Sequence, residues 1–181
     1  MLDKPIIVGC GTMGSSLALK LSQTKYISQL KLYDFDVVGE TNSYPFKKEE
    51  CGLPKIKIIE FLCRKYNSNL TIESYQEKVT RPFQLNSFVI DCRDCKDTDI
   101  GSRLKISLDG CLLYIDSIRY RKVNQNYHRY MQPRNETYIN KAMNIIETYL
   151  EKSEYIFGEL KLYNLEDNSS YILKREDEGC L

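Results

Sequence analysis

The chain has 181 residues, of which 42% are hydrophobic and 28% are charged. This length and composition predict a single domain over 1–181, with a substantial core. The net charge of +1 excludes a general electrostatic attraction to nucleic acid or anionic membranes. No apolar run reaches the roughly 20 residues that a membrane span needs. We therefore expect a soluble, cytoplasmic protein with no nucleic-acid or membrane partner.

The cysteines are expected to be reduced thiols. There are seven of them, an odd number, and no signal-peptide pattern accompanies them. Cys92 and Cys95 have the spacing of half a zinc site, but His128 is the only histidine and there is no second CxxC pair, so four zinc ligands are not expected. Three cysteines lie in apolar patterns and are predicted to be buried: Cys10, Cys63 and Cys111.

The amino-terminal part of the chain alternates short apolar runs with helical patterns. The expected elements are a strand over 6–8, a helix over 13–21, a strand over 30–33, a helix over 52–66 and strands over 70–74 and 88–90. Strands and helices that alternate at this spacing predict a parallel sheet with right-handed crossovers.

The pattern is looser in the carboxyl-terminal part. A strand is expected over 112–115, with its carboxyl end at the same sheet edge as the first strand's. The stretch 119–134 holds five arginines and lysines and no acid. A helix over 136–152 and an antiparallel hairpin over 155–163 and 170–175 complete the prediction. The expected fold class is α/β: a Rossmann-like parallel sheet with flanking helices, then a helix and antiparallel strands.

A glycine pattern follows the first strand. Gly9, Gly11 and Gly14 open the first predicted helix, and Asp34 comes 20 residues after the last glycine, at the end of the second strand. In a strand–turn–helix unit such glycines let the backbone approach a phosphate at the positive end of the helix, and the acid binds ribose hydroxyls. The pattern predicts a nucleotide site, and adenylating enzymes and dehydrogenases both fit it.

Three further blocks narrow this choice. They are "DFDVVGETNSYPF" over 34–46, "CGLPKIK" over 51–57 and "VIDCRD" over 89–94. Together with the glycine pattern, and in this order, they resemble the superfamily of ThiF, MoeB and ubiquitin-activating enzymes, which are ATP-dependent adenylyltransferases. The resemblance covers about 4–110, so we take 4–116 as the motif-bearing core and 117–181 as a divergent part.

The resemblance implies a role for each motif residue. Gly9, Gly11, Gly14 and Ser15 would cradle the nucleotide, and Asp34 would hold the ribose. Asp36 would be a further cofactor-binding carboxylate, Asn42 and Lys55 would contact the phosphates, and Asp94 would bind magnesium. Lys55 and Asp94 would be the catalytic residues. Adenylation needs charge neutralisation on the triphosphate rather than a protein nucleophile or base.

The sequence departs from the family pattern in three places. The family arginine three residues after Asn42 is missing from "SYPFKK", Cys95 replaces the asparagine after Asp94, and a strand at residue 6 leaves no room for the family's amino-terminal helices, which carry a second arginine. A homodimer that offers Arg121 or Arg129 to the neighbouring site would restore the missing charge.

The leading hypothesis is an adenylyltransferase that uses ATP and Mg to activate the carboxyl terminus of a ubiquitin-like or sulfur-carrier protein. No cysteine lies between Cys111 and Cys180, so we expect no stable enzyme thioester. The alternatives are a catalytically degenerate subunit that supports an active partner in a heterodimer and, favoured only by the glycines and Asp34, an NAD-dependent oxidoreductase.

Overall fold

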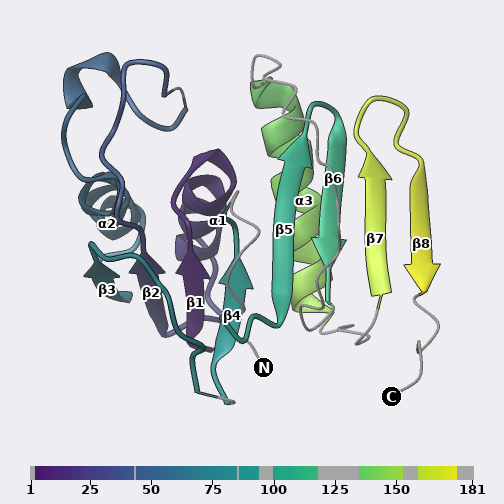
Figure 1. Cartoon of the computed structure of the whole chain (residues 1–181), viewed down its shortest axis with the longest axis horizontal. Coiled ribbons are helices and arrows are strands. Elements are labelled where there is room, and N and C mark those ends of the chain that lie inside the picture. The colour runs from purple at the N-terminus through teal and green to yellow at the C-terminus, as the bar shows by residue number, and fades with distance from the viewer. Residues whose placement is uncertain are drawn as a thin grey trace.

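The computed structural model describes residues 3–42, 44–84, 86–93, 100–117, 135–152 and 159–174. Figure 1 shows one sheet with helices packed behind it. The strands are β1 (Pro5–Val8), β2 (Gln29–Tyr33), β3 (Thr71–Tyr75), β4 (Phe88–Asp91), β5 (Leu104–Asp109), β6 (Leu112–Asp116), β7 (Glu159–Asn164) and β8 (Ser170–Lys174). The helices are α1 (Thr12–Ser22), the 3-10 helix η1 (Lys48–Glu50), α2 (Lys55–Tyr66) and α3 (Glu136–Glu151).

The sheet has eight strands in the order β3-β2-β1-β4-β5-β6-β7-β8. The first five strands of this order are parallel to one another. Val8 lies opposite both Tyr33 and Asp91, so β1, β2 and β4 end level with one another. The chain order reverses between β1 and β4, and ligands of such sheets bind at the carboxyl ends of the strands beside this point. The α/β, Rossmann-like prediction is confirmed.

The carboxyl-terminal half differs from the prediction. The expected strand over 112–115 is β6, which runs antiparallel to β5. Its carboxyl end therefore lies at the edge opposite to the glycine turn, and the prediction that the two share an edge is wrong. The unpredicted β5 pairs with β6 through a two-residue connection in which Gly110 has φ +57°. Asp-Gly between two alternating apolar runs is a hairpin signal, and it explains the reversal of direction.

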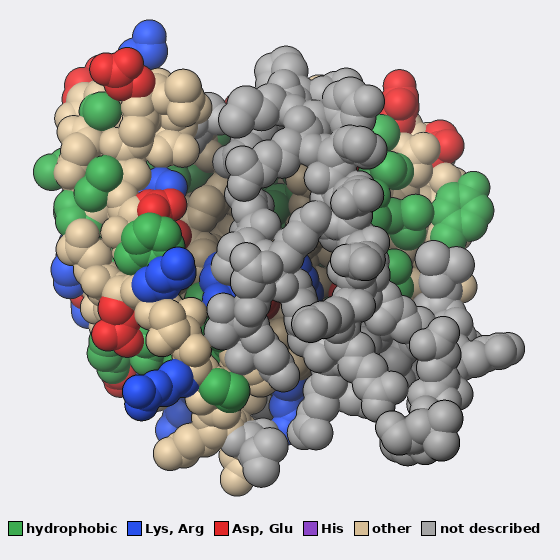
Figure 2. Space-filling model, in the orientation of Figure 1, with side chains coloured by type: hydrophobic (Ala, Val, Ile, Leu, Met, Phe, Trp, Pro, Cys, Tyr) green, Lys and Arg blue, Asp and Glu red, His purple; other side chains and the backbone are tan. Residues whose placement is uncertain are grey.

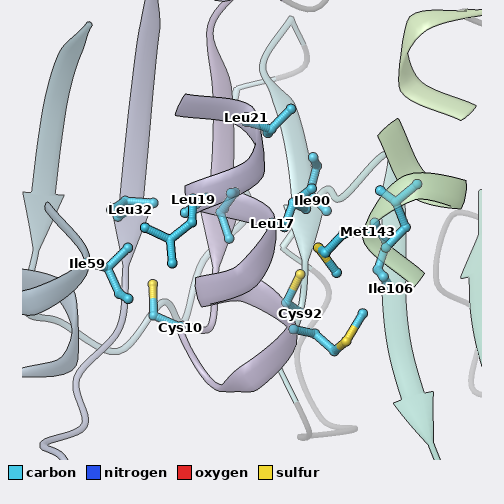
Figure 3. Packing of buried hydrophobic residues seen from close by; sticks show 14 of the residues in the cluster. Cys10, Leu17, Leu19, Leu21, Leu32, Ile59, Ile90, Cys92, Ile106 and Met143 are labelled. Carbon is cyan, nitrogen blue, oxygen red and sulfur yellow. The ribbon is translucent and has the colours of Figure 1, made fainter. Parts of the chain in front are cut away.

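The three α-helices cover one face of the sheet and share one large core. Figure 3 shows Leu17 and Leu21 of α1 between Ile59 of α2 and Met143 of α3, and all four side chains are buried. This core joins the motif-bearing part to the divergent part of the chain. Cys10 and Cys63 are fully buried in it, as predicted, whereas Cys111 lies in the β5–β6 connection and is only half-buried.

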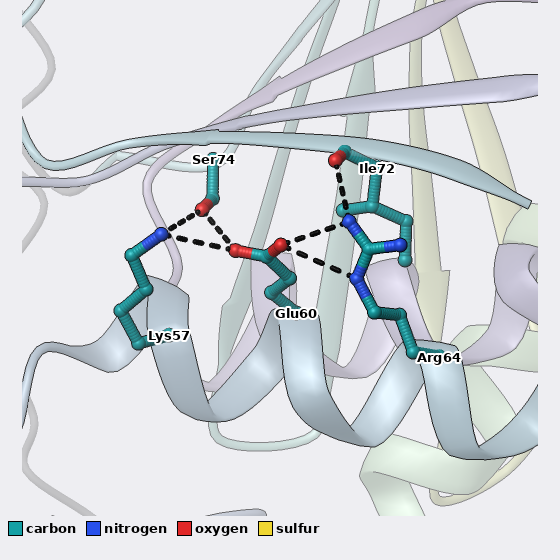
Figure 4. A network of polar contacts seen from close by, with 5 residues as sticks. All are labelled: Lys57, Glu60, Arg64, Ile72 and Ser74. Carbon is teal, nitrogen blue, oxygen red and sulfur yellow. Dashed lines mark hydrogen bonds and ion pairs between the residues drawn. The ribbon is translucent and has the colours of Figure 1, made fainter.

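A polar network holds α2 against β3 (Figure 4). The Glu60 carboxylate accepts hydrogen bonds from Lys57, Arg64 and Ser74, and Arg64 also donates to the carbonyl oxygen of Ile72 at 3.0 Å. The helix begins at residue 55 rather than 52 because Gly52 has φ +86° and Pro54, with φ −59°, caps the helix. Lys55 is thereby fixed as the first residue of α2.

The other face of the sheet carries a smaller apolar cluster, formed by Ile6, Val8, Val89 and Ile100. Figure 2 shows this face, where acidic and basic side chains intermingle over the described part and form no field of one sign. None of the described helices is long and apolar enough to cross a bilayer.

Candidate nucleotide site

The glycine turn joins β1 to α1, and each glycine has a different physical reason. Gly9 has φ +90°, and a Cβ there would lie 2.9 Å from the backbone nitrogen of Arg93. A Cβ on Gly14 would lie 1.8 Å from the carbonyl oxygen of Gly9. A Cβ on Gly11 would meet nothing within 4 Å. Packing thus requires Gly9 and Gly14, whereas Gly11 leaves open space where a ligand could approach the backbone.

The amino end of α1 faces this open position. Gly11 caps the helix without a side-chain hydrogen bond, and the first turn contains no acidic residue. The first N–H groups of a helix have no acceptor within the helix and carry a partial positive charge. Ser15 is fully buried beneath the turn, and its hydroxyl donates to the carbonyl oxygen of Cys10 at 2.7 Å. This hydrogen bond of the Ser15 side chain therefore stabilises the turn.

Asp34 joins the end of β2 to the glycine turn. One carboxylate oxygen accepts a hydrogen bond from the backbone N–H of Cys10, and the other accepts one from the N–H of Asp36 at 2.7 Å. Burial raises the pKa of Asp34 above its ordinary value, although the two backbone hydrogen bonds oppose this shift. A carboxylate has about four lone-pair positions, so these two bonds leave room for ribose hydroxyls to donate as well.

Lys55 and Asp36 form an ion pair at the same edge, with 3.2 Å between Nζ and the carboxylate. The Lys55 side chain is 10% exposed and that of Asp36 is 48% exposed. Asp36 also donates its N–H to the Asp34 carboxylate, which accepts the N–H of Cys10, so a chain of polar contacts links Lys55 to the glycine turn. The first turn of α2 has neither an acid nor a side-chain cap. The open amino end of α2 and the Lys55 ammonium thus lie at the same edge of the sheet as the open amino end of α1.

Asn42 lies in a local turn. Its side-chain oxygen accepts a hydrogen bond from the N–H of Gly39 at 2.7 Å, and its own N–H donates to the carbonyl oxygen of Gly39 at 2.9 Å. These bonds match those of an ordinary Asx turn. A phosphate contact by its amide nitrogen stays a prediction.

Asp94, Arg121 and Arg129 lie outside the described residues, and so does Cys95. Within the described ranges no group of three acidic, histidine or cysteine side chains could hold a metal ion. The magnesium prediction therefore rests on Asp94 alone.

Sequence reasoning did not reveal a buried charge cluster at the end of β4. Asp91 is 1% exposed and receives two hydrogen bonds of 3.0 Å from the Arg93 guanidinium, while the ammonium of Lys105 lies 3.7 Å away. Lys105 also donates to the carbonyl oxygen of Arg93 at 3.2 Å. Asp91 is thus committed to a structural cluster, and Arg93 is packed against Gly9. Only the parallel pairing of β4 with β5 brings Lys105 to this place.

Strand order, glycine turn and strand-end acids together define a Rossmann-like α/β protein whose nucleotide-type turn lies at the switch point of its sheet. The sequence model of the ThiF family matches residues 3–133. This chain belongs to the ThiF family.

Solved structures share the fold at low sequence identity. PaaA superposes with a TM-score of 0.70 at 16% identity, over 96% of this chain and 64% of PaaA. E. coli MccB, solved with AMPCPP and MccA, gives a TM-score of 0.73 at 14% identity, over 96% of this chain and 64% of MccB. E. coli MccB solved with ATP gives 0.69 at 13% identity, with the same coverage. The chain therefore spans about 64% of the length of these proteins. No curated protein sequence matches it.

Proposed function

We propose that this protein is an ATP-dependent adenylyltransferase that activates a carboxylate, namely the carboxyl terminus of a ubiquitin-like or sulfur-carrier protein. The observation that carries the proposal is the position of Lys55. A buried ammonium opens α2 at the positive end of the helix, near a glycine turn that leaves the amino end of α1 open. Two helix termini and a lysine suit a triphosphate, whereas the pyrophosphate of NAD needs only the terminus of the first helix.

The proposed reaction needs no protein nucleophile. A carboxylate oxygen of the substrate attacks the α-phosphorus of ATP, the new oxygen–phosphorus bond forms, and the bond to the β-phosphate oxygen breaks to release pyrophosphate. Lys55 would hold the β- and γ-phosphates, and the open N–H groups at Gly11 and the start of α1 would face the phosphate chain. Asp34 and Asp36 would bind the ribose hydroxyls.

The comparisons support this assignment at the level of the family. The chain belongs to the ThiF family, and the similar protein MccB has been solved with ATP and, separately, with AMPCPP and MccA. Magnesium would be held by Asp94 and would neutralise phosphate charge. The described side chains do not form a magnesium site by themselves, so no step is assigned to the ion.

One observation favours a second candidate, a supporting subunit without activity of its own. The sequence after Asn42 lacks the arginine of the family pattern. Losing a transition-state arginine in phosphoryl transfer costs about three to five orders of magnitude in rate. Such a subunit would bind ATP or an active partner without releasing pyrophosphate.

ATP–pyrophosphate exchange separates these candidates. With the correct carrier protein, the wild-type chain should return labelled pyrophosphate to ATP, because only adenylation is reversible in this way. Lys55→Met should abolish exchange, whereas Lys57→Met on the exposed side of the same helix should retain it. ATP binding without exchange, for every carrier tried, would favour the supporting subunit. Tighter binding of NAD than of ATP would overturn both.

A further inference from the structure

A cavity lies between α3 and β7, on the helix-covered face and separated from β4 by β5 and β6 in the sheet order. Its volume is about 360 Å³. The lining that matters here comes from Ile145, Tyr149 and Lys152 at the end of α3 and from Lys161 and Tyr163 on β7. No acidic side chain of the described residues lines it.

Lys161 is the unusual member of this lining. The residue is only 9% exposed, and its ammonium lies 4.7 Å from the centre of the Tyr149 ring. In the part of the chain that the structure describes, the Lys161 ammonium makes no hydrogen bond and no ion pair, and Glu159 on the same strand face is not within ion-pair distance of it.

A ring face stabilises a cation but satisfies none of its donors. Cation–π contacts contribute about 0.5–2 kcal/mol. The Lys161 Nζ atom is accessible to solvent, so its three N–H donors remain open to an acceptor in the cavity. Lys152 adds a second positive charge to the same lining. The described lining thus offers two positive charges and no acidic side chain to a ligand in the cavity.

We propose that this cavity binds a carboxylate carried by an aromatic or aliphatic group. Lys161 would pair with the carboxylate, and Ile145, Tyr149 and Tyr163 would contact the apolar group. The volume falls in the lower part of the roughly 300–1,000 Å³ range of small-molecule sites. A free organic acid and the carboxyl-terminal residue of a peptide share this chemistry. The site is independent of the proposed adenylation.

The competing explanation is structural. The carbonyl end of α3 carries a partial negative charge, and a nearby lysine stabilises such an end by about 0.3–1 kcal/mol. If this were the whole role of Lys161, the cavity would bind a carboxylic acid and its neutral amide equally well.

The test uses the full chain and calorimetry with three probes: N-acetylphenylalanine, its neutral amide and 3-phenylpropionate. The acid should bind at least tenfold more tightly than the amide, because only the acid can pair with Lys161. Binding of 3-phenylpropionate as well indicates a free acid, and binding of N-acetylphenylalanine alone indicates the terminus of a peptide.

Lys161→Met should remove the preference for the acid, whereas Lys65→Met, an exposed lysine of α2, should leave it unchanged. Lys55→Met should leave it unchanged too, which separates this site from the proposed nucleotide site. The comparison of the acid with the amide uses the wild-type chain, so it tests the proposal even if a variant fails to fold. Equal affinity for the two, no binding of any probe at millimolar concentration, or a preference that survives Lys161→Met overturns the proposal.

Discussion

At the scale of single residues, Lys55 occupies a position that stability alone does not favour. A positive charge at the positive end of a helix is unfavourable, and this one is also largely buried. Asp36 offsets part of the cost from a half-exposed position. Residues that lower stability at an open site are typical of function, because a ligand can provide the missing interaction.

Lys55→Met should weaken ATP binding about 10- to 100-fold, since a charge-assisted phosphate contact contributes roughly 1.5–3 kcal/mol. Adenosine binding should change little, and the melting temperature should stay the same or rise. Lys57→Met is the matched control, because Lys57 lies two residues further on and contacts Glu60 and Ser74. Calorimetry with both ligands measures the effect. An equal loss for adenosine and ATP would show that Lys55 does not contact phosphate.

Asp34 should give stability a measurable pH dependence. Burial raises its pKa in the folded protein, so from about pH 4, the ordinary pKa of an aspartate, up to the raised value, the folded state holds a proton that the unfolded chain has lost. The free energy of unfolding therefore falls as the pH rises through this window. Asp34→Asn removes this slope and leaves one backbone N–H without its acceptor, at a cost of about 1–3 kcal/mol.

Urea unfolding of wild type and Asp34→Asn between pH 4 and 7 tests the sign. The deficit of the variant should shrink as the pH rises. Asp167→Asn is a useful contrast when the series is extended below about pH 4. Hydrogen bonds from Ser169 lower the pKa of this exposed carboxylate, so its contribution to stability is lost as the pH falls through that lower range, with a slope of opposite sign. A deficit for Asp34→Asn that grows with pH would contradict the assigned protonation behaviour.

At the scale of elements, the strand–turn–helix unit of β1 and α1 was predictable because its signals are local. The glycine spacing, the apolar run before it and the acid after β2 all lie within 6–34. The β5 half of the β5–β6 hairpin was missed, although the apolar/polar alternation of Leu104–Asp109 and the Asp-Gly pair that follows are local signals for it. The cluster of Asp91, Arg93 and Lys105 could not be found from sequence, since it depends on which strands pair.

The glycines of this unit provide a sharp element-scale prediction. Gly14→Ala should strongly destabilise or prevent folding, because its Cβ would lie 1.8 Å from the backbone oxygen of Gly9. Gly11→Ala should fold normally, because Gly11 has φ −67° and nothing lies within 4 Å of the added atom. It should nevertheless weaken ATP binding, since the methyl group occupies the space next to the open helix end. Thermal unfolding and calorimetry report the two effects separately. Wild-type ATP affinity in Gly11→Ala would place the phosphates elsewhere.

At the scale of the whole molecule, a parallel half and an antiparallel half share one core. The parallel half carries the glycine turn, Asp34 and Lys55. Its strand order, and the shared edge at which its strands end, follow from general rules for alternating strands and helices, which a sequence pattern is enough to apply. The antiparallel half carries the cavity at Lys161. No sequence motif predicts this cavity, because its lining residues come together only when α3 packs on β7. Local patterns thus predicted one candidate site, and tertiary packing alone revealed the other.

Because both halves share a core, nucleotide binding at one edge should stabilise the whole chain. A ligand at one hundred times its Kd adds about 2.7 kcal/mol to the free energy of unfolding. For a domain of this size each kcal/mol raises Tm by about 2–4 °C, so saturating ATP should raise Tm by about 5–10 °C in a single transition.

NAD at the same concentration should raise Tm far less, because its site would not use Lys55. Lys55→Met should lose most of the ATP shift and Lys57→Met should keep it. An equal or larger shift with NAD would identify the turn as a dinucleotide site, and a shift with ATP that survives Lys55→Met would remove the observation on which the adenylyltransferase proposal depends.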